Sequence, residues 1–142
     1  MRLLHISDLH IGKTIYEQTL IEDQKFILDK ITETIKNDNI DALLVAGDVY
    51  DRSVPSTEAV DLLNAFLSKI VLELKKKVFI ISGNHDSKER LGFSNKILEK
   101  QGLFIQTTYE GQIKTITLEK EKTKIYMLPF IKPAEVQKYF DE

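Results

Sequence analysis

Short runs of apolar residues alternate with longer amphipathic stretches along the first two thirds of the chain. Continuous apolar runs are typical of strands covered on both faces of a parallel sheet. They lie at residues 3–6, 42–46 and 78–81. Helical spacing of apolar positions indicates helices between and after these runs. These helices are predicted at 16–37, 56–77 and 87–100. Because connections between parallel strands are right-handed, this order predicts an α/β fold with a parallel sheet.

Signals at the helix ends and in the last third refine this picture. Ser56 is a suitable N-cap for the second helix, and the lysines at 75–77 suit its C-terminal end, where cations favour the helix dipole. After Gly102 the pattern changes to that of short strands joined by hairpins. These strands are predicted at 103–106, 112–118 and 124–128. Pro133 fits the first turn of a final helix over 134–140.

The composition is that of a folded domain with little net charge. Of 142 residues, 42% are hydrophobic and 30% are charged, so the chain can bury a core. A net charge of −2 argues against a purely charge-driven grip on nucleic acid. The N-terminus becomes polar too early for a signal peptide, and no apolar run approaches the roughly 20 residues that span a bilayer. We therefore expect a cytoplasmic protein.

Cysteine is absent, and the chain has three histidines, His5, His10 and His85. Disulfides, thiolate zinc sites, iron–sulfur clusters and cysteine nucleophiles are therefore excluded. Any metal site must use oxygen and imidazole ligands.

Polar residues follow each of the three predicted parallel strands. These clusters are Ser-Asp-Leu-His at 7–10, Gly-Asp-Val-Tyr-Asp-Arg at 47–52 and Ser-Gly-Asn-His-Asp at 82–86. In open α/β sheets, ligands bind beyond the carboxyl ends of the strands. The clusters are therefore expected to converge on one site, although they lie far apart in the sequence.

The side chains in these clusters suit a metal. On an extended segment Asp8 and His10 point the same way, while Asp48 adds a carboxylate and Asn84 an amide oxygen. Mixed nitrogen and oxygen ligands favour manganese, iron or zinc over magnesium. A carboxylate can also bridge two cations roughly 3.5–4 Å apart, as in two-metal hydrolases.

Each of these residues also has an ordinary structural interpretation. An aspartate or asparagine after a strand is often a turn former. Asp86, with Glu89 three residues later, fits a helix N-cap, and His5 fits a packed histidine inside the first strand. The joint order of the three clusters favours a functional site over these separate interpretations.

The three clusters resemble the first three motifs of the calcineurin-like metallophosphoesterases. The segments 5–12, 47–56 and 128–130 are similar, more narrowly, to a nuclease component of a bacterial DNA-repair complex within that family. The resemblance implies a metallophosphoesterase-type layered sheet with flanking helices, incomplete at the C-terminus. It also implies Mn²⁺ as cofactor, and DNA and an SMC-like ATPase as partners of a dimeric parent protein.

The resemblance implies a role for each matching residue. Asp8 and His10 would bind the first metal, Asp48 would bridge both metals, and Asn84 would bind the second. His85 would face the scissile phosphate and stabilise the transition state or protonate the leaving oxygen.

Two further roles concern the second cluster. Asp51 would hydrogen-bond His85 and favour its cationic form, which also follows from the effect of a carboxylate on an imidazole. Arg52 would contact phosphate, and a surface salt bridge is an equally good interpretation of this residue.

One departure from the family concerns the later histidines. The family completes its metal sites with three histidines from later motifs, and no histidine follows His85 here. We therefore expect residues 1–142 to be the N-terminal part of a longer nuclease, without its cap domain. The chain itself should bind metal weakly and cleave DNA poorly or not at all, because an incomplete ligand shell loses affinity.

Three other functions remain open at this stage. The same scaffold could serve a phosphomonoesterase or a cyclic-nucleotide phosphodiesterase. The chain could also be a non-catalytic interaction module with a vestigial site. A magnesium-binding receiver or phosphatase site would leave Asn84 and His85 without a role.

Overall fold

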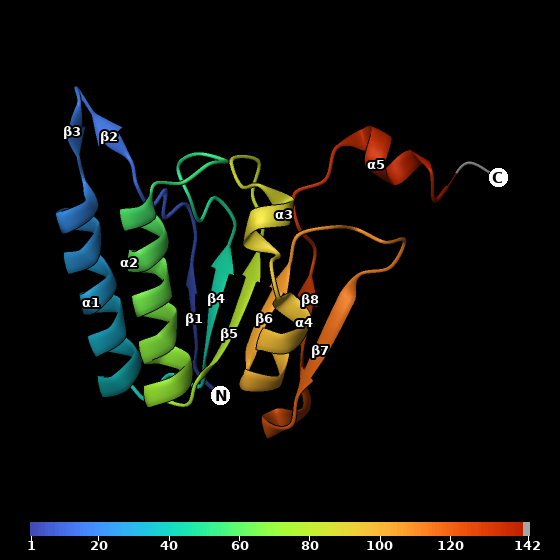
Figure 1. Cartoon of the computed structure of the whole chain (residues 1–142). Helices are drawn as coiled ribbons and strands as arrows, with labels where there is room; N and C mark the ends of the chain where they lie inside the picture. Colours follow the sequence, from blue (N-terminus) through green and yellow to red (C-terminus); the bar gives the residue numbers. More distant parts are fainter. Residues whose placement is uncertain (141–142) are drawn as a thin grey trace.

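A four-stranded parallel sheet forms the centre of the computed structural model, which describes residues 1–140. The strand order is β1-β4-β5-β6 (Figure 1). The strands span Leu3–Ile6 in β1, Ala42–Ala46 in β4, Lys77–Ile81 in β5 and Leu103–Gln106 in β6. All pairings are parallel, so the carboxyl ends meet at one edge, the upper edge in Figure 1. The α/β fold with a parallel sheet is confirmed.

Two long helices cover one face of this sheet. They are α1 at Ile21–Asn37 and α2 at Thr57–Ser68, which continues into the π-helical turn η1 at Lys69–Glu73. As predicted, Ser56 caps α2, and its hydroxyl oxygen accepts a hydrogen bond from the Ala59 amide at 3.3 Å. Within residues 1–140, none of the helices combines the length and the apolar character that a membrane crossing requires.

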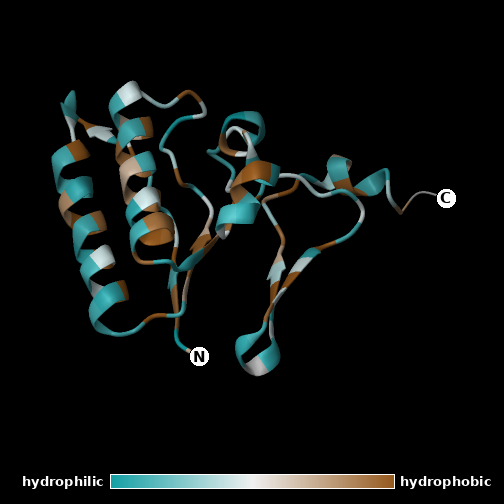
Figure 2. Ribbon diagram, turned by 60° about the horizontal axis from the view of Figure 1, so that its bottom comes forward, coloured by the Kyte–Doolittle hydropathy of each residue, from teal (hydrophilic) through white to brown (hydrophobic). Residues whose placement is uncertain are grey.

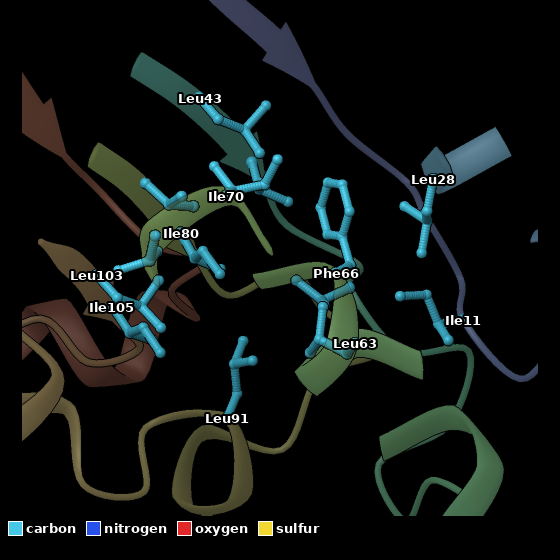
Figure 3. Packing of buried hydrophobic residues seen from close by; sticks show 14 of the residues in the cluster. Ile11, Leu28, Leu43, Leu63, Phe66, Ile70, Ile80, Leu91, Leu103 and Ile105 are labelled. Carbon is cyan, nitrogen blue, oxygen red and sulfur yellow. The ribbon is translucent and has the colours of Figure 1, made fainter. Parts of the chain in front are cut away.

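The main core lies between these helices and the sheet. In Figure 3, Leu63 and Phe66 of α2 lie between Ile11 and Leu28 on one side and Ile80 of β5 on the other. Figure 2 shows the alternation that produces this packing, with hydrophobic and hydrophilic sides on α1 and α2. The apolar positions at helical spacing are thus the ones that face the sheet.

A hairpin covers part of the opposite face of the sheet. Its strands are β7 at Lys114–Leu118 and β8 at Thr123–Met127, joined by the 3₁₀ turn η3 at Lys120–Lys122. Leu118 and Met127 pack against Phe79 and Phe104, whose rings stack with centroids 4.8 Å apart. The predicted hairpin is confirmed, and it forms a second layer over β5 and β6.

The last described helix, α5, spans Pro133–Gln137 and begins at the predicted proline. The Glu135 carboxylate pairs with the Lys88 ammonium of α3, the short helix Lys88–Leu91 that follows β5. This ion pair joins α5 to the carboxyl edge of the sheet.

The first helix begins later than predicted. Residues 14–19 form a small hairpin instead, with β2 at Thr14–Ile15 and β3 at Gln18–Thr19. Tyr16 and Glu17 between them have φ values of 48° and 66°. Two consecutive left-handed residues make a tight two-residue turn that a helix cannot contain.

The third helix is broken into α3, α4 at Asn95–Leu98 and the 3₁₀ turn η2 at Glu99–Gln101. Ser94 lies in the left-handed region, with φ of 59°, which ends the helical path between α3 and α4. The cap of α3 also differs from the prediction. Ser87, not Asp86, is the N-cap, and its hydroxyl oxygen accepts from the Arg90 amide at 3.3 Å.

The first strand is an edge strand with one uncovered face, so the prediction that it is fully buried is wrong. Leu3 is 38% exposed, and His5 is exposed instead of packed in the core. Leu4 and Ile6 face the helices. The hairpin β7–β8 lies at the β6 side of the sheet (Figure 1), and within residues 1–140 β1 pairs only with β4.

Replacing Phe66 with alanine should destabilise the fold strongly, because Phe66 is 3% exposed and lies at the centre of the core. We expect the free energy of unfolding to fall by about 3–5 kcal/mol, measured by urea titration. Phe26→Ala on α1 is the matched control, because Phe26 is 60% exposed. Its expected effect is about 0.5 kcal/mol or less. Equal losses would contradict this placement of the core.

Asp41 connects the start of β4 to both the N-terminus and the hairpin. Its carboxylate accepts hydrogen bonds from the Arg2 amide at 2.6 Å and from the Lys120 ammonium at 2.7 Å. The Lys120 hydrogen bond, followed by the Arg2 amide, lowers the pKa of Asp41 below its usual 3.8.

A lowered pKa means that the ionised carboxylate stabilises the folded state. The contribution is complete above the unfolded pKa and is lost as the pH falls through the lower folded pKa. Asp41→Asn should therefore reduce the melting temperature at pH 7, and the difference from wild type should shrink below about pH 4. Asp61→Asn, an exposed position on α2, is the control and should show no such convergence. A constant difference for Asp41→Asn down to pH 2 would contradict this assignment.

Candidate metal centre

The segments that follow β1 and β4 run side by side beyond the sheet edge. The amide of Asp8 donates to the Gly47 carbonyl at 3.1 Å, and the amide of His10 donates to the Asp48 carbonyl at 2.9 Å. Ile11 continues the pattern by donating to the Val49 carbonyl at 2.9 Å. The first two polar clusters are thus joined by backbone hydrogen bonds, as their position after adjacent parallel strands predicts.

Asp8, His10 and Asp48 bring three ligand atoms together, all within 4.8 Å of one another. The Nε2 atom of His10 lies 3.9 Å from Asp8 Oδ1 and 3.9 Å from Asp48 Oδ2. The Asp8 side chain is exposed, whereas those of His10 and Asp48 are largely covered. The imidazole therefore presents one nitrogen to two carboxylates at the rim of the sheet.

All three of these residues have left-handed backbone conformations. Their φ values are 55° for Asp8, 44° for His10 and 48° for Asp48. Such conformations cost on the order of 1–2 kcal/mol for residues other than glycine. The cost is tolerated at sharp turns that aim side chains into a site.

Asp51 contacts both histidines of the site, through different groups. Its carboxylate Oδ1 lies 3.3 Å from His10 Nδ1, the nitrogen that faces away from Asp8 and Asp48. Its backbone carbonyl lies 3.2 Å from His85 Nδ1. The structure thus pairs Asp51 with His85 through the main chain, whereas its side chain orients His10. A carboxylate behind a ligating imidazole is the usual support of a metal-binding histidine.

The third cluster approaches the same group. The His85 amide donates to Asp48 Oδ1 at 3.0 Å, and the His85 ring lies edge-on to His10, with centroids 5.1 Å apart. Asn84 is exposed between Gly83 and His85. A Cβ atom on Gly83 would lie 2.1 Å from Asp48 Oδ1, so only glycine permits this approach.

Arg52 is exposed beside the site. It lines a cavity of about 440 Å³ with Gly12, Thr14, Ser56 and Glu58. None of the ion pairs found within residues 1–140 includes Arg52, so the salt-bridge interpretation finds no support there.

Gln24 of α1 holds the first cluster in place, and the sequence analysis missed it. Its carbonyl oxygen accepts from the Gly12 amide at 2.9 Å, and its amide nitrogen donates to the carbonyls of His10 at 2.7 Å and Leu9 at 3.2 Å. A polar residue on the buried side of a helix is a signal that could have identified it.

Burial also affects Tyr50, which lies within the second cluster. Loss of solvation raises the pKa of its phenol to about 12, and the nearby Asp86 carboxylate acts in the same direction. The phenol is therefore neutral at any physiological pH.

The residues present fit a divalent metal. One imidazole nitrogen and two carboxylates form a ligand set for manganese, iron or zinc. His10 has the oriented second nitrogen that such sites require.

Comparison with known proteins agrees with this fold and site. The sequence model for calcineurin-like phosphoesterases matches residues 1–135, so the chain belongs to that family, whose members bind divalent metals. Two similar curated proteins both carry the name of SbcD, one of the two components of the nuclease SbcCD. The one from Staphylococcus saprophyticus is 37% identical over 142 residues, and the one from Staphylococcus epidermidis is 38% identical over 142 residues. Each match covers 100% of this chain and 37% of the relative's length.

Removing the Gln24 side chain should loosen the first cluster. Gln24→Ala leaves the Gly12 amide and two carbonyls without their partner, so we expect a loss of about 1–3 kcal/mol in the free energy of unfolding. Hydrogen exchange of the Gly12 amide should accelerate more than exchange in β4. Lys25→Ala, on the exposed side of α1, is the control and should change neither quantity. Unchanged exchange at Gly12 in the Gln24 variant would contradict this role.

Proposed function

We propose that this chain carries half of the two-metal site of a phosphodiesterase that acts on DNA. The observation that carries the proposal is the convergence of Asp8, His10 and Asp48 within 4.8 Å, with His85 beside them. Membership of the calcineurin-like phosphoesterases supports hydrolysis of a phosphate ester. The names of the relatives support a nuclease over a phosphomonoesterase.

In this proposal Asp8 and His10 hold one cation, Asp48 bridges to a second, and Asn84 contributes to the second. Mn²⁺ fits the mixed nitrogen and oxygen ligands. When bound, divalent cations supply positive charge that neutralises the phosphodiester and makes a water more acidic. The second ligand set requires donors beyond the four residues named here.

His85 supplies the proton at the leaving oxygen. A backbone carbonyl only accepts, so the contact with the Asp51 carbonyl keeps a proton on His85 Nδ1. Nε2 is then the atom that can donate to the departing oxygen when the ring is cationic. Arg52, on the rim of the neighbouring cavity, contributes positive charge for the DNA backbone.

The chain spans 37% of the length of the relatives it matches. We propose that it is the N-terminal part of a longer SbcD-like nuclease, whose later histidines complete the metal ligands and whose further segments include a cap domain. The partner would be an SbcC-like SMC ATPase, with two copies of each protein in the assembly. The 142-residue chain alone should then bind metal weakly and show little or no nuclease activity.

Metal binding by the 142-residue chain tests the first part. Titration with Mn²⁺, followed by electron paramagnetic resonance of the free ion, should show weak binding to the wild type. Asp48→Ala should weaken it by about tenfold or more, because the proposed bridging carboxylate is lost. Asp61→Ala on the exposed face of α2 is the matched control and should bind like the wild type. Equal binding by all three proteins would contradict a metal site at Asp48.

A chimera tests the phosphodiesterase chemistry. Residues 1–142 would replace the matching segment of the Staphylococcus epidermidis relative, and cleavage of DNA and of bis-p-nitrophenyl phosphate would be measured with Mn²⁺. His85→Ala should reduce cleavage by about 100- to 10,000-fold while Mn²⁺ binding persists, because His85 acts as an acid and not as a ligand. Exposed His5→Ala is the control. A folded chimera that binds Mn²⁺ and cleaves neither substrate would refute the proposal.

A further inference from the structure

Asp86 is a buried carboxylate at the junction of the second and third polar clusters. It is 8% exposed, and its oxygens accept hydrogen bonds from three backbone amides. Oδ2 accepts from Gly83 at 2.9 Å and from Val49 at 3.2 Å, and Oδ1 accepts from Tyr50 at 3.0 Å. Two of these donors lie 37 and 36 residues earlier in the chain.

This environment suits a carboxylate and no other side chain. Burial of an ionised group is costly unless hydrogen bonds replace its hydration. Here three donors face two oxygens, and an ionised carboxylate is an acceptor at both. An asparagine would turn an amide group with two hydrogens toward at least one of these donors. A structural cap would not need this arrangement, since Ser87 already caps α3.

The segments that Asp86 joins carry the candidate ligands Asp48 and Asn84 and the candidate acid His85. Neither segment belongs to the sheet, because β4 ends at Ala46 and β5 ends at Ile81. The backbone bonds of the 47–49 segment run to the first cluster and not to the third. The spacing between the second and third clusters therefore rests on Asp86 and on the contacts that His85 makes with Asp48 and Asp51.

We propose that Asp86 is a positioning residue of the metal centre. Its carboxylate fixes the distance between the Asp48 segment and the Asn84–His85 segment, and it touches neither metal nor substrate. This inference rests on the proposed metal site. It differs from the proposed function because it assigns the geometry of that site to a residue outside the ligand set.

The mechanism is an effect of distance. A cation shared by groups on two segments binds tightly only when both segments hold their ligands at coordination distance, and loss of an outer support commonly costs about 10- to 100-fold in metal affinity. Metal binding should in turn favour the joined arrangement, because the coupling between the two events is reciprocal.

The test compares two buried polar residues of the same loop in the 142-residue chain. Asp86→Asn should weaken Mn²⁺ binding by about 10- to 100-fold, measured where all proteins are folded by circular dichroism. Ser82→Ala is the matched control, because Ser82 is 1% exposed and donates to the Thr107 carbonyl, away from the Asp48 segment. It should lower the melting temperature without changing Mn²⁺ affinity.

The outcomes separate this inference from the proposed function. If Asp48→Ala abolishes binding and Asp86→Asn binds like the wild type, Asp86 is only structural and the inference fails alone. If the wild type does not bind Mn²⁺, or Asp48→Ala binds equally well, both fail. Asp86→Glu keeps the charge but lengthens the side chain, so wild-type affinity in this variant would also overturn a role that depends on distance.

A second measurement uses the wild type and does not depend on the folding of a variant. Hydrogen exchange of the Val49, Tyr50 and Gly83 amides should slow when Mn²⁺ is added, because the metal and Asp86 favour the same arrangement. The amides of β6 serve as the internal reference. Exchange at these three amides that is unchanged by saturating Mn²⁺ would overturn the inference.

Discussion

The backbone contact between the turns after β4 and β5 is the constraint on which the candidate site depends. A Cβ atom on Gly47 would lie 2.9 Å from the Gly83 backbone, and one on Gly83 would lie 2.1 Å from the Asp48 carboxylate. Because the register pairs Ala46 with Ile81, both strands end at the same level. Glycine in both turns lets the polar residues beyond them approach without side chains in between.

The site is strained locally and is held by its surroundings. Asp8, His10 and Asp48 all have left-handed backbone conformations, which persist only when other interactions determine them. Backbone hydrogen bonds between the first and second clusters supply part of that support, and Gln24 supplies more from α1. The well-packed core under α1 and α2 gives these loops a rigid base, the common arrangement in proteins whose loops carry the chemistry.

The two faces of the sheet differ in how completely they are covered. On the helical face, Leu43, Ile70 and Ile80 are fully buried. On the other face the hairpin covers β5 and β6, whereas Leu3 of β1 remains 38% exposed. Further segments of the proposed longer protein would bury this remaining surface, since exposed apolar residues on an edge strand favour pairing with another chain.

Patterns along the chain were sufficient to predict the parallel strands, Ser56 as a cap, the hairpin after Gly102 and the three polar clusters. These features depend on neighbouring residues, whose periodicity and turn chemistry report their local environment. The sequence by itself did not determine that Asp51 orients His10 through its side chain, that Asp86 joins two loops, or that His5 is exposed. These depend on partners up to 41 residues away in the case of Asp51, and on which layer covers which face. Hydrogen bonds and burial of that kind exist only once the strands are side by side, so only the tertiary structure could decide them.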